Sequence, residues 1–331
     1  MNEADEALVV GEALVDVIRD GRGAVSEHAG GSPANVAVGL ARLGRPTTLL
    51  TRLGEDRHGR LVAEHLHREG VALPLGRQAA ATSYAEALIG PDGSADYRFS
   101  LEWTLPELPD LAEVAELPRP IVVHTGSLGA VVPPGADTVI DLLSARRGEA
   151  TVTYDLNIRP AVMGEGADLW ARVARVVALA DVVKASDEDL AHLVPGATAS
   201  DAARRLLDLG PVAVVVTGGG EGAVCLTRHG STSTPAPEVV VADTVGAGDS
   251  FCSAMIDRLW EWGALGGSAR PTLRSLDLAA WSDVLDHAAA AAAITVSRPG
   301  ANPPTRADLE SAPGRRPGAL GSDRVTASTR G

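Results

Sequence analysis

Cysteine and aromatic residues are scarce in this chain of 331 residues. The two cysteines, Cys225 and Cys252, stand inside apolar stretches and cannot form a framework of disulfide bridges, so we expect a reducing, cytoplasmic location. Their spacing suggests no zinc site. Aromatic residues make up only 3% of the sequence, which argues against platforms for stacked bases and predicts a core of Ala, Val and Leu.

Positive charge and long apolar runs are scarce as well. The 29 Lys and Arg residues stand against 43 Asp and Glu, and the net charge of −14 repels nucleic acid and anionic membranes. No run of about 18 apolar residues occurs, and the N-terminal sequence MNEADEALVV lacks the basic start of a secretion signal. We therefore expect no nucleic-acid or membrane partner, and local groups must hold any anionic ligand.

Short β-branched stretches alternate with segments that have a period of about 3.6 residues, which predicts an α/β fold with a mainly parallel sheet. Helices are predicted over residues 33–44 and 56–70, where Pro33 and Asp56 start them and a glycine ends each. The predicted strands are residues 7–18, 47–54, 120–126, 150–157, 180–186 and 212–218.

Three segments interrupt this alternation. Residues 82–100 form two alternating stretches around the turn sequence PDGS, which predicts an antiparallel hairpin that serves as a lid. Residues 262–280 are interpreted as a surface excursion. Residues 311–331 contain almost no large apolar side chains, so we expect a mobile tail.

The sequence DTVGAGDS, residues 243–250, stands between the apolar run EVVVA and the helix-like FCSAMIDRLW. Where a strand is followed by a helix, main-chain amides and the helix dipole can hold an anion, and Gly246 and Gly248 let a phosphate approach closely. Asp249 would then lie beside that phosphate. The alternative is that Asp249 only caps the helix and the glycines form a turn.

A second glycine-rich stretch, TGGGEGA at residues 217–223, follows the predicted strand VAVVV and matches the dinucleotide fingerprint. The sequence that follows, VCLTRHG, alternates like a strand, so no helix start would receive a pyrophosphate. A hairpin that clasps a nucleotide from the side fits better, with a plain tight turn as the alternative. A Walker loop and a G-x-S-x-G elbow are absent.

Three further stretches carry polar candidates. Asn35, in the first turn of the helix within HAGGSPANVAVGLARLG, could bond sugar hydroxyls or simply belong to a helix start. In TYDLNIRP, a predicted strand ends with Asp155, Asn157 and Arg159, where an open α/β sheet binds its ligands. Arg159 could neutralise a phosphate or pair with a nearby acid. Asp187 and Asp189, in KASDED, could be outer-sphere Mg²⁺ partners or belong to a solvated, capped helix start.

Together these stretches resemble the ribokinase, or PfkB, family of carbohydrate kinases. GGSPANVAVGLARLG resembles the first signature of the family and DTVGAGDSFCSAM the second, and GEALVD, RLGEDRHG, DLNIRP, KASDED, TGGGEGA and VSRPGA follow the family's order up to about residue 305. The resemblance implies a three-layer α/β sandwich with a small β-sheet lid. It also implies that ATP and Mg²⁺ phosphorylate a sugar hydroxyl.

The resemblance assigns roles to individual residues. Asp249 would be the catalytic base, and the amides of Gly246, Ala247 and Gly248 would form an anion hole. The residues that would hold the sugar are Asp16, Gly30, Gly31, Asn35 and Arg159. The residues that would border the nucleotide are Lys184, Thr217, Gly219, Gly220, Gly222, Gly246 and Gly248.

Metal ions are also implied by the resemblance. Asp189 would reach Mg²⁺ through water, because the family often has Asn and Glu where this chain has Ser186 and Asp189. A potassium ion would lie beside the anion hole, although Pro304 stands where a serine often helps. Its ligands would be carbonyls of Asp243, Val245, Thr295 and Gly300.

The stretches GGSPANVA and DLNIRP are most similar to the fructokinase branch, which implies fructose as the acceptor, phosphorylated at its 6-hydroxyl. Ribose, 2-keto-3-deoxygluconate and nucleosides remain alternatives. From other classes, a nicotinamide-dependent oxidoreductase and a non-catalytic sugar sensor also remain. We expect one kinase domain over residues 1–310, lid segments near 13–28 and 82–102, and a homodimer formed through the lid.

Overall fold

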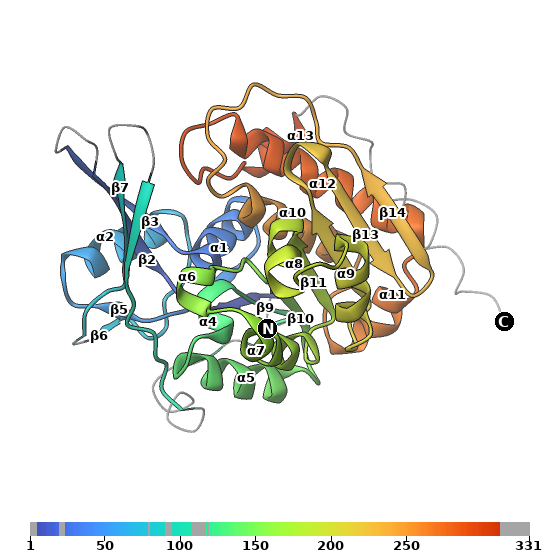
Figure 1. Cartoon of the computed structure of the whole chain (residues 1–331), viewed down its shortest axis with the longest axis horizontal. Coiled ribbons are helices and arrows are strands. Elements are labelled where there is room, and N and C mark those ends of the chain that lie inside the picture. The colour runs from blue at the N-terminus through green and yellow to red at the C-terminus, as the bar shows by residue number, and fades with distance from the viewer. Residues whose placement is uncertain are drawn as a thin grey trace, which may run out of the picture.

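The computed structural model describes residues 5–19, 24–78, 80–89, 95–107, 117 and 119–311, so all but the first residue of the predicted tail lies outside the described residues. The body is an eight-stranded sheet with helices on both faces, and a separate four-stranded sheet stands beside one end of it (Figure 1). A two-stranded sheet pairs β5 (Leu53–Gly54) with β6 (Arg77–Gln78). The predicted α/β sandwich with a small additional sheet is confirmed.

The central sheet has the strand order β14-β13-β12-β11-β10-β9-β1-β4. Its neighbours run parallel from β12 to β4, whereas β13 and β14 add an antiparallel edge. The carboxyl ends of the parallel strands meet at one edge, where open α/β sheets bind ligands. The strands are β1 (Ala7–Val10), β4 (Thr47–Leu50), β9 (Val122–Gly126), β10 (Thr151–Asp155), β11 (Val182–Ser186), β12 (Ala213–Thr217), β13 (Ala223–Thr227) and β14 (Gly230–Thr234).

Two apolar cores cover the two faces of this sheet. In β1, Ala7 and Val9 face one core and Leu8 and Val10 face the other, because successive side chains of a strand point to opposite faces. The first core includes residues of α1 (Ser32–Arg42), α2 (Arg57–Arg68), α10 (Ala247–Glu261) and α12 (Leu278–Val296). The second includes residues of α5 (Gly135–Arg146), α7 (Gly166–Val177), α8 (Asp187–Leu193) and α9 (Ala199–Leu207).

Both cores consist mainly of Ala, Val and Leu, as the scarcity of aromatic residues predicts. The shorter helices are α4 (Ser127–Val131), α6 (Pro160–Met163), α11 (Arg270–Arg274) and α13 (Arg306–Glu310), with single 3₁₀ turns η1 (Gly219–Glu221) and η2 (Gly267–Ala269). No helix in the described part of the chain is both long and apolar enough to span a bilayer.

The four-stranded sheet, which we call the lid, has the order β3-β2-β7-β8. It is formed by β2 (Leu14–Arg19), β3 (Val25–Gly30), β7 (Tyr84–Ile89) and β8 (Ala95–Ser100). The antiparallel pairing of β7 and β8 confirms the predicted hairpin, whose turn at residues 91–94 lies outside the described residues. The predicted strand 7–18 is divided, because β1 joins the central sheet and β2 joins the lid.

The prediction that the apolar run before DTVGAGDS is a strand is wrong. Residues 238–242 form no strand, and Val240 is 88% exposed. The sheet already ends with β14, and Pro235 and Pro237 follow, which lack the N–H that a strand ladder needs. The segment is held instead by the end of α12, where the Ala242 amide donates to the Val296 carbonyl at 2.7 Å.

The prediction that residues 262–280 form a surface excursion is also wrong. Ala264, Leu265 and Leu273 are buried in the first core. Arg270 reaches the amino end of β11, where its guanidinium lies 2.9 Å from the carboxylate of Asp181. These residues therefore lie at the amino ends of the parallel strands, opposite to the candidate site described below.

Candidate active site

The start of α10 presents bare main-chain amides. Gly246 has a φ of 76°, and a Cβ at this position would lie 2.7 Å from the side chain of Ala301. A Cβ on Gly248 would lie 2.9 Å from Nζ of Lys184, so the ammonium group stands directly beside this turn. The amides of Gly246 and Gly248 have no backbone acceptor within the described residues, whereas the Ala247 amide donates to a carbonyl at 3.3 Å. With the dipole of α10, these groups can receive an anion.

Asp249 lies in the first turn of α10 and is half-buried. Ser32 donates its hydroxyl to one carboxylate oxygen at 2.6 Å, and the amide of Asn35 donates to the other at 2.8 Å. The start of α10 has no side-chain cap, so the alternative that Asp249 is a helix cap is not realised. Sequence reasoning missed Ser32, although its place inside GGSPAN put it in the same helix start as Asn35.

Asp16 and the glycine pair before α1 meet at the base of the lid. A Cβ on Gly30 would lie 2.2 Å from the carboxylate of Asp16, so only glycine fits there without a shift. The pKa of Asp16 is raised to about 6, because burial and the charge of Asp249, which raise it, outweigh His28 and Arg159, which lower it. Asp16, the predicted sugar-binding residue on β2, is therefore close enough to the predicted base Asp249 for their charges to interact.

Gly31 precedes α1 and has a φ of 100°. A Cβ on this residue would lie 2.7 Å from the carbonyl oxygen of Glu12, so the backbone of the β1–β2 connection packs closely against the start of α1. Arg159 is exposed after β10, and its guanidinium donates to the carbonyl of Ile158 at 3.0 Å. The hydrogen bonds that Arg159 donates within the described residues go to Ile158 and Met163 and not to an acid, so the alternative of a surface ion pair is not realised.

Asp155 and Lys184 form a buried ion pair at the carboxyl ends of β10 and β11, with 3.1 Å between Nζ and Oδ2. Burial raises the pKa of Asp155 to about 6, although Lys184 lowers it. The other oxygen of Asp155 is buried without a hydrogen-bond partner. Burial alone would lower the pKa of Lys184, but Asp155 outweighs this and raises it. Lys184 is the only lysine of the chain, and the sequence placed its partner Asp155 at a ligand-binding strand end without assigning it a role.

Asp189 is buried in the first turn of α8, where it closes a capping box with Ser186. One carboxylate oxygen accepts the Ser186 amide and the other accepts the Ile158 amide, each at 2.7 Å. A capped helix start, one alternative for KASDED, is thus realised here. The proposed contact of Asp189 with Mg²⁺ through water stays a prediction.

The second glycine-rich stretch joins β12 to the antiparallel β13 through η1. Gly222 has a φ of 98°, and a Cβ there would lie 2.1 Å from the carbonyl of Thr234. Thr217 stands beside Ser186 in the parallel register, so this hairpin adjoins the carboxyl end of β11. No helix of four or more residues follows it before β13, which removes the basis for the nicotinamide alternative.

Asp243 and Gly300 meet beside Gly246. The carboxylate of Asp243 accepts the amides of Val245 at 3.0 Å and Gly300 at 2.9 Å, which lowers the pKa of Asp243. Thr295 is buried on α12, its hydroxyl donates to α10, and its carbonyl accepts the Arg298 amide at 3.0 Å. Within the described ranges, no group of three or more His, Cys, Asp or Glu side chains could hold a metal ion.

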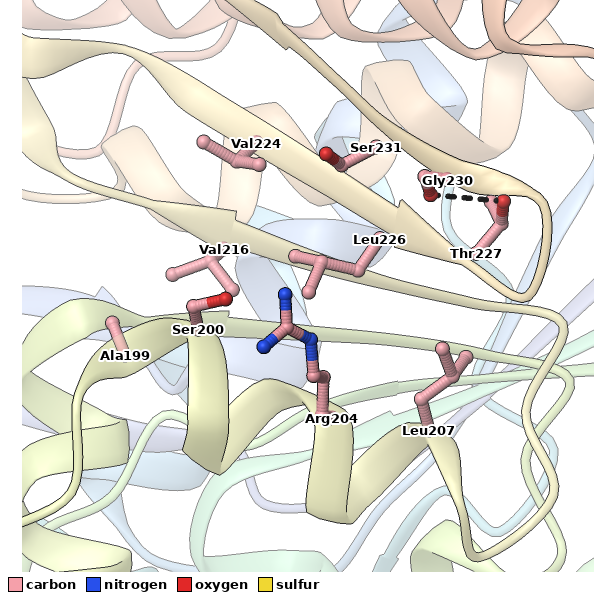
Figure 2. A pocket seen from close by; sticks show the side chains of 10 residues that line it. All are labelled: Ala199, Ser200, Arg204, Leu207, Val216, Val224, Leu226, Thr227, Gly230 and Ser231. Carbon is pink, nitrogen blue, oxygen red and sulfur yellow. Dashed lines mark hydrogen bonds between the residues drawn. The ribbon is translucent and has the colours of Figure 1, made fainter.

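A cavity of about 240 Å³ lies elsewhere, between α9 and the edge of the central sheet (Figure 2). Val216, Val224 and Leu226 come from the strands, and Arg204 reaches toward them from α9. None of the predicted site residues lines this cavity. The cavity is therefore separate from the candidate active site.

The sequence profile described as pfkB family carbohydrate kinase matches residues 4–308. The chain belongs to this family. A fructokinase of Rhizobium leguminosarum bv. trifolii is 32% identical over 273 residues, which cover 76% of this chain and 79% of the relative. The aminoimidazole riboside kinase of Salmonella typhimurium is 28% identical over 262 residues, which cover 77% of this chain and 81% of the relative.

Solved structures of PfkB kinases agree with this assignment. The fructokinase of Xylella fastidiosa with bound ATP has a TM-score of 0.80 and 26% identity, over 93% of this chain and 98% of that one. A fructokinase double mutant of Vibrio cholerae O395, in a form with fructose, ADP and potassium ion, has a TM-score of 0.75 and 26% identity, over 94% and 99%. The protein is a PfkB-family sugar kinase, a phosphotransferase that acts on a sugar hydroxyl.

Proposed function

We propose that this PfkB kinase is an ATP-dependent fructokinase that converts fructose to fructose 6-phosphate. The observation that carries the proposal is the setting of Asp249. Two side chains of α1 hold its carboxylate, and the bare amides of its own helix start lie directly before it. The similarity to fructokinases favours fructose as the acceptor. The similarity to an aminoimidazole riboside kinase makes a nucleoside-like acceptor the second candidate.

The acceptor would lie between the lid and α1. Asp16 on β2 and Asn35 on α1 both offer polar groups close to Asp249, and each can bond a sugar hydroxyl. Gly30 and Gly31 leave the space that Asp16 and the β1–β2 connection occupy. Arg159 adds a positive charge on this side of the site. We therefore assign sugar binding to these five residues.

In the proposed reaction, Asp249 takes the proton of the 6-hydroxyl while the hydroxyl oxygen forms a bond to the γ-phosphorus of ATP. The bond from that phosphorus to the bridging oxygen breaks, and ADP leaves with this oxygen. The amides of Gly246, Ala247 and Gly248, with Lys184 beside them, would stabilise the charge on the migrating group. Preorganised donors of this kind are effective because they need no rearrangement during the reaction.

The nucleotide would lie along the hairpin that contains Thr217, Gly219, Gly220 and Gly222, next to the carboxyl end of β11. The carboxylates of Asp155 and Asp189 have the chemistry that suits Mg²⁺ held through water, and the ion supplies positive charge to the phosphates when it is bound. The loops of Asp243, Val245 and Gly300, with the end of α12 at Thr295, would hold potassium.

A panel of acceptors tests the proposal. The purified full chain is assayed with ATP and Mg²⁺ for ADP release with fructose, ribose, 2-keto-3-deoxygluconate, aminoimidazole riboside and a purine nucleoside. We expect the highest kcat/KM with fructose and a product phosphorylated at the 6-position, as identified by phosphorus NMR. A higher kcat/KM with a nucleoside would replace fructose by the second candidate. No ADP release with any acceptor would contradict the fructokinase assignment and favour a sugar sensor.

A further inference from the structure

One buried carboxylate close to the base takes no part in the reaction proposed above. Glu12 lies in the connection between β1 and β2 and is 3% exposed. Its Oε2 accepts the backbone amide of Gly129 in α4 at 2.7 Å. Burial raises the pKa of Glu12 to about 7, whereas the amide of Gly129 and the hydroxyl of Ser127 lower it. Asp249 lies close enough to raise it.

The backbone around Glu12 is packed at very short range. A Cβ on Gly129 would lie 2.9 Å from Oε2 of Glu12, and a Cβ on Gly31 would lie 2.7 Å from the carbonyl oxygen of Glu12. A Cβ on Gly11 would lie 2.3 Å from the ring of Pro33 in the first turn of α1. Glu12 therefore holds α4 through its side chain and supports the start of α1 through its main chain.

The start of α1 in turn holds the proposed base. Ser32 follows Gly31 directly, and Ser32 and Asn35 both donate to Asp249. Among the described residues, Asp249 from α10 and Tyr154 from β10 are ionisable groups whose charge interacts with that of Glu12. The sequences of α4 (SLGAV) and of the first turn of α1 (SPAN) contain no ionisable side chain.

We propose that Glu12 is a positioning residue, which keeps the start of α1 in the place from which Ser32 and Asn35 align Asp249. This inference rests on the proposed role of Asp249 as the base. Glu12 touches no substrate and acts through Ser32. Loss of the carboxylate would leave the Gly129 amide buried without an acceptor. The main chain of Glu12 would then no longer be held by α4, and the start of α1 that packs against it could move relative to α10.

Kinetics of three variants test the proposal, with the acceptor that wild-type protein uses best in the panel. We expect Glu12→Ala to lower kcat at least about 10-fold, and Glu12→Gln to keep kcat within about 3-fold, because its amide oxygen can still accept from Gly129. The matched control is Asp181→Ala. Asp181 is also buried and accepts a backbone amide, from Val152 at 2.9 Å, but at the opposite edge of the sheet.

The control separates positioning from plain destabilisation. Because Asp181 also pairs with Arg270, we expect Asp181→Ala to lower the melting temperature at least as much as Glu12→Ala, while its kcat stays within about 2-fold of wild type. If Glu12→Ala loses stability but keeps kcat, or if both variants lose kcat equally, Glu12 is a structural residue only.

The route through Ser32 has its own test. We expect Ser32→Ala to lower kcat about 3- to 10-fold, and the double variant with Glu12→Ala to be no slower than the slower single variant, because both changes break the same connection. Multiplied effects would mean that Glu12 acts independently of Ser32.

A measurement without turnover keeps this inference distinct from the proposed function. Hydrogen–deuterium exchange should be faster in residues 30–40 and 127–131 of Glu12→Ala than of wild type, and unchanged there in Asp181→Ala. Unchanged exchange in Glu12→Ala overturns the positioning role even if the protein phosphorylates no acceptor of the panel. If exchange changes but wild-type protein is inactive, the proposed function fails and the packing role of Glu12 stands.

Discussion

Asp155 and Asp257 are both fully buried, yet their surroundings shift their pKa values in opposite directions. Burial alone would raise the pKa of Asp257 on α10, but hydrogen bonds from His287 and Arg306, together with the charges of Arg306 and Arg45, lower it to about 2. Asp155 has one cationic partner, Lys184, and its pKa rises to about 6. A buried carboxylate with all its bonds made stabilises the fold. One that is left short of partners can respond to the charge of a ligand.

A third acid, Asp249, lies two turns before Asp257 on the same helix, and the largest effect is expected there. Asp249→Asn should lower kcat about 10³- to 10⁴-fold, because an amide cannot take the proton of the acceptor hydroxyl. Its melting temperature should stay close to that of wild type, because the amide oxygen can still accept from Ser32. Steady-state kinetics and thermal unfolding check this. Turnover near the wild-type rate would remove Asp249 as the base.

Asp257→Asn should show the reverse pattern. Removing the charge leaves Arg45, Arg306 and His287 without their shared partner, so the free energy of unfolding should fall by about 3–5 kcal/mol. Because the pKa of Asp257 is lowered from 3.8 to about 2, its stabilising effect is present above about pH 4 and is lost as the pH falls toward 2. Urea unfolding measures the loss. A kcat more than about 2-fold below wild type would contradict a purely structural role.

Lys184→Met removes the cationic partner of Asp155. We expect kcat to fall about 10²- to 10³-fold, because the migrating phosphoryl group loses a positive charge. Asp155, left without Lys184, should take up a proton more readily, so the loss of stability should be larger at about pH 8 than at about pH 5.5. Urea unfolding at both values checks the second point. Equal losses at the two pH values would show that Asp155 stays ionised.

Glu12→Gln gives the smallest effect and tests whether the pKa of this buried carboxyl group is raised. The pKa of Glu12 is raised from 4.5 to about 7, so the folded protein binds a proton that the unfolded chain releases within this range. The stability of wild type relative to Glu12→Gln should therefore be highest below pH 4.5 and should decline up to about pH 7, by at most about 3 kcal/mol. Unfolding of both proteins across this range measures the difference. A difference that is constant with pH would contradict the raised pKa.

The sequence predicted the elements whose signals are local. Pro33 and Asp56 mark helix starts that the structure confirms, and the turn sequence between two alternating stretches indicated the hairpin of the lid. The glycines of DTVGAGDS located the start of α10 because a positive φ and close packing at Gly246 require that residue type. The same local signals could not show that residues 238–242 leave the sheet, since an exposed apolar run looks like a buried one.

The contacts of the candidate site depend on the register between distant segments. Ser32 and Asp249 are 217 positions apart, and Asp155 pairs with Lys184 only because β10 and β11 lie side by side. Residues 262–280 contain many small residues typical of loops, yet Leu273 is fully buried. Such contacts depend on which strands and helices become neighbours when the sheet assembles. The spacing of residues along the chain carries no information about that order.

Because the chain has a single lysine, the proposed phosphate side of the site can be observed in isolation. Protein grown with isotopically labelled lysine carries one labelled side-chain ammonium group, at residue 184, buried between the carboxylate of Asp155 and the start of α10. Because the chain has no other lysine, a spectroscopic signal from the labelled ammonium group can be assigned to Lys184 directly. Titration with ADP, ATP or inorganic phosphate would then report which of them reaches the ammonium group, independently of any acceptor.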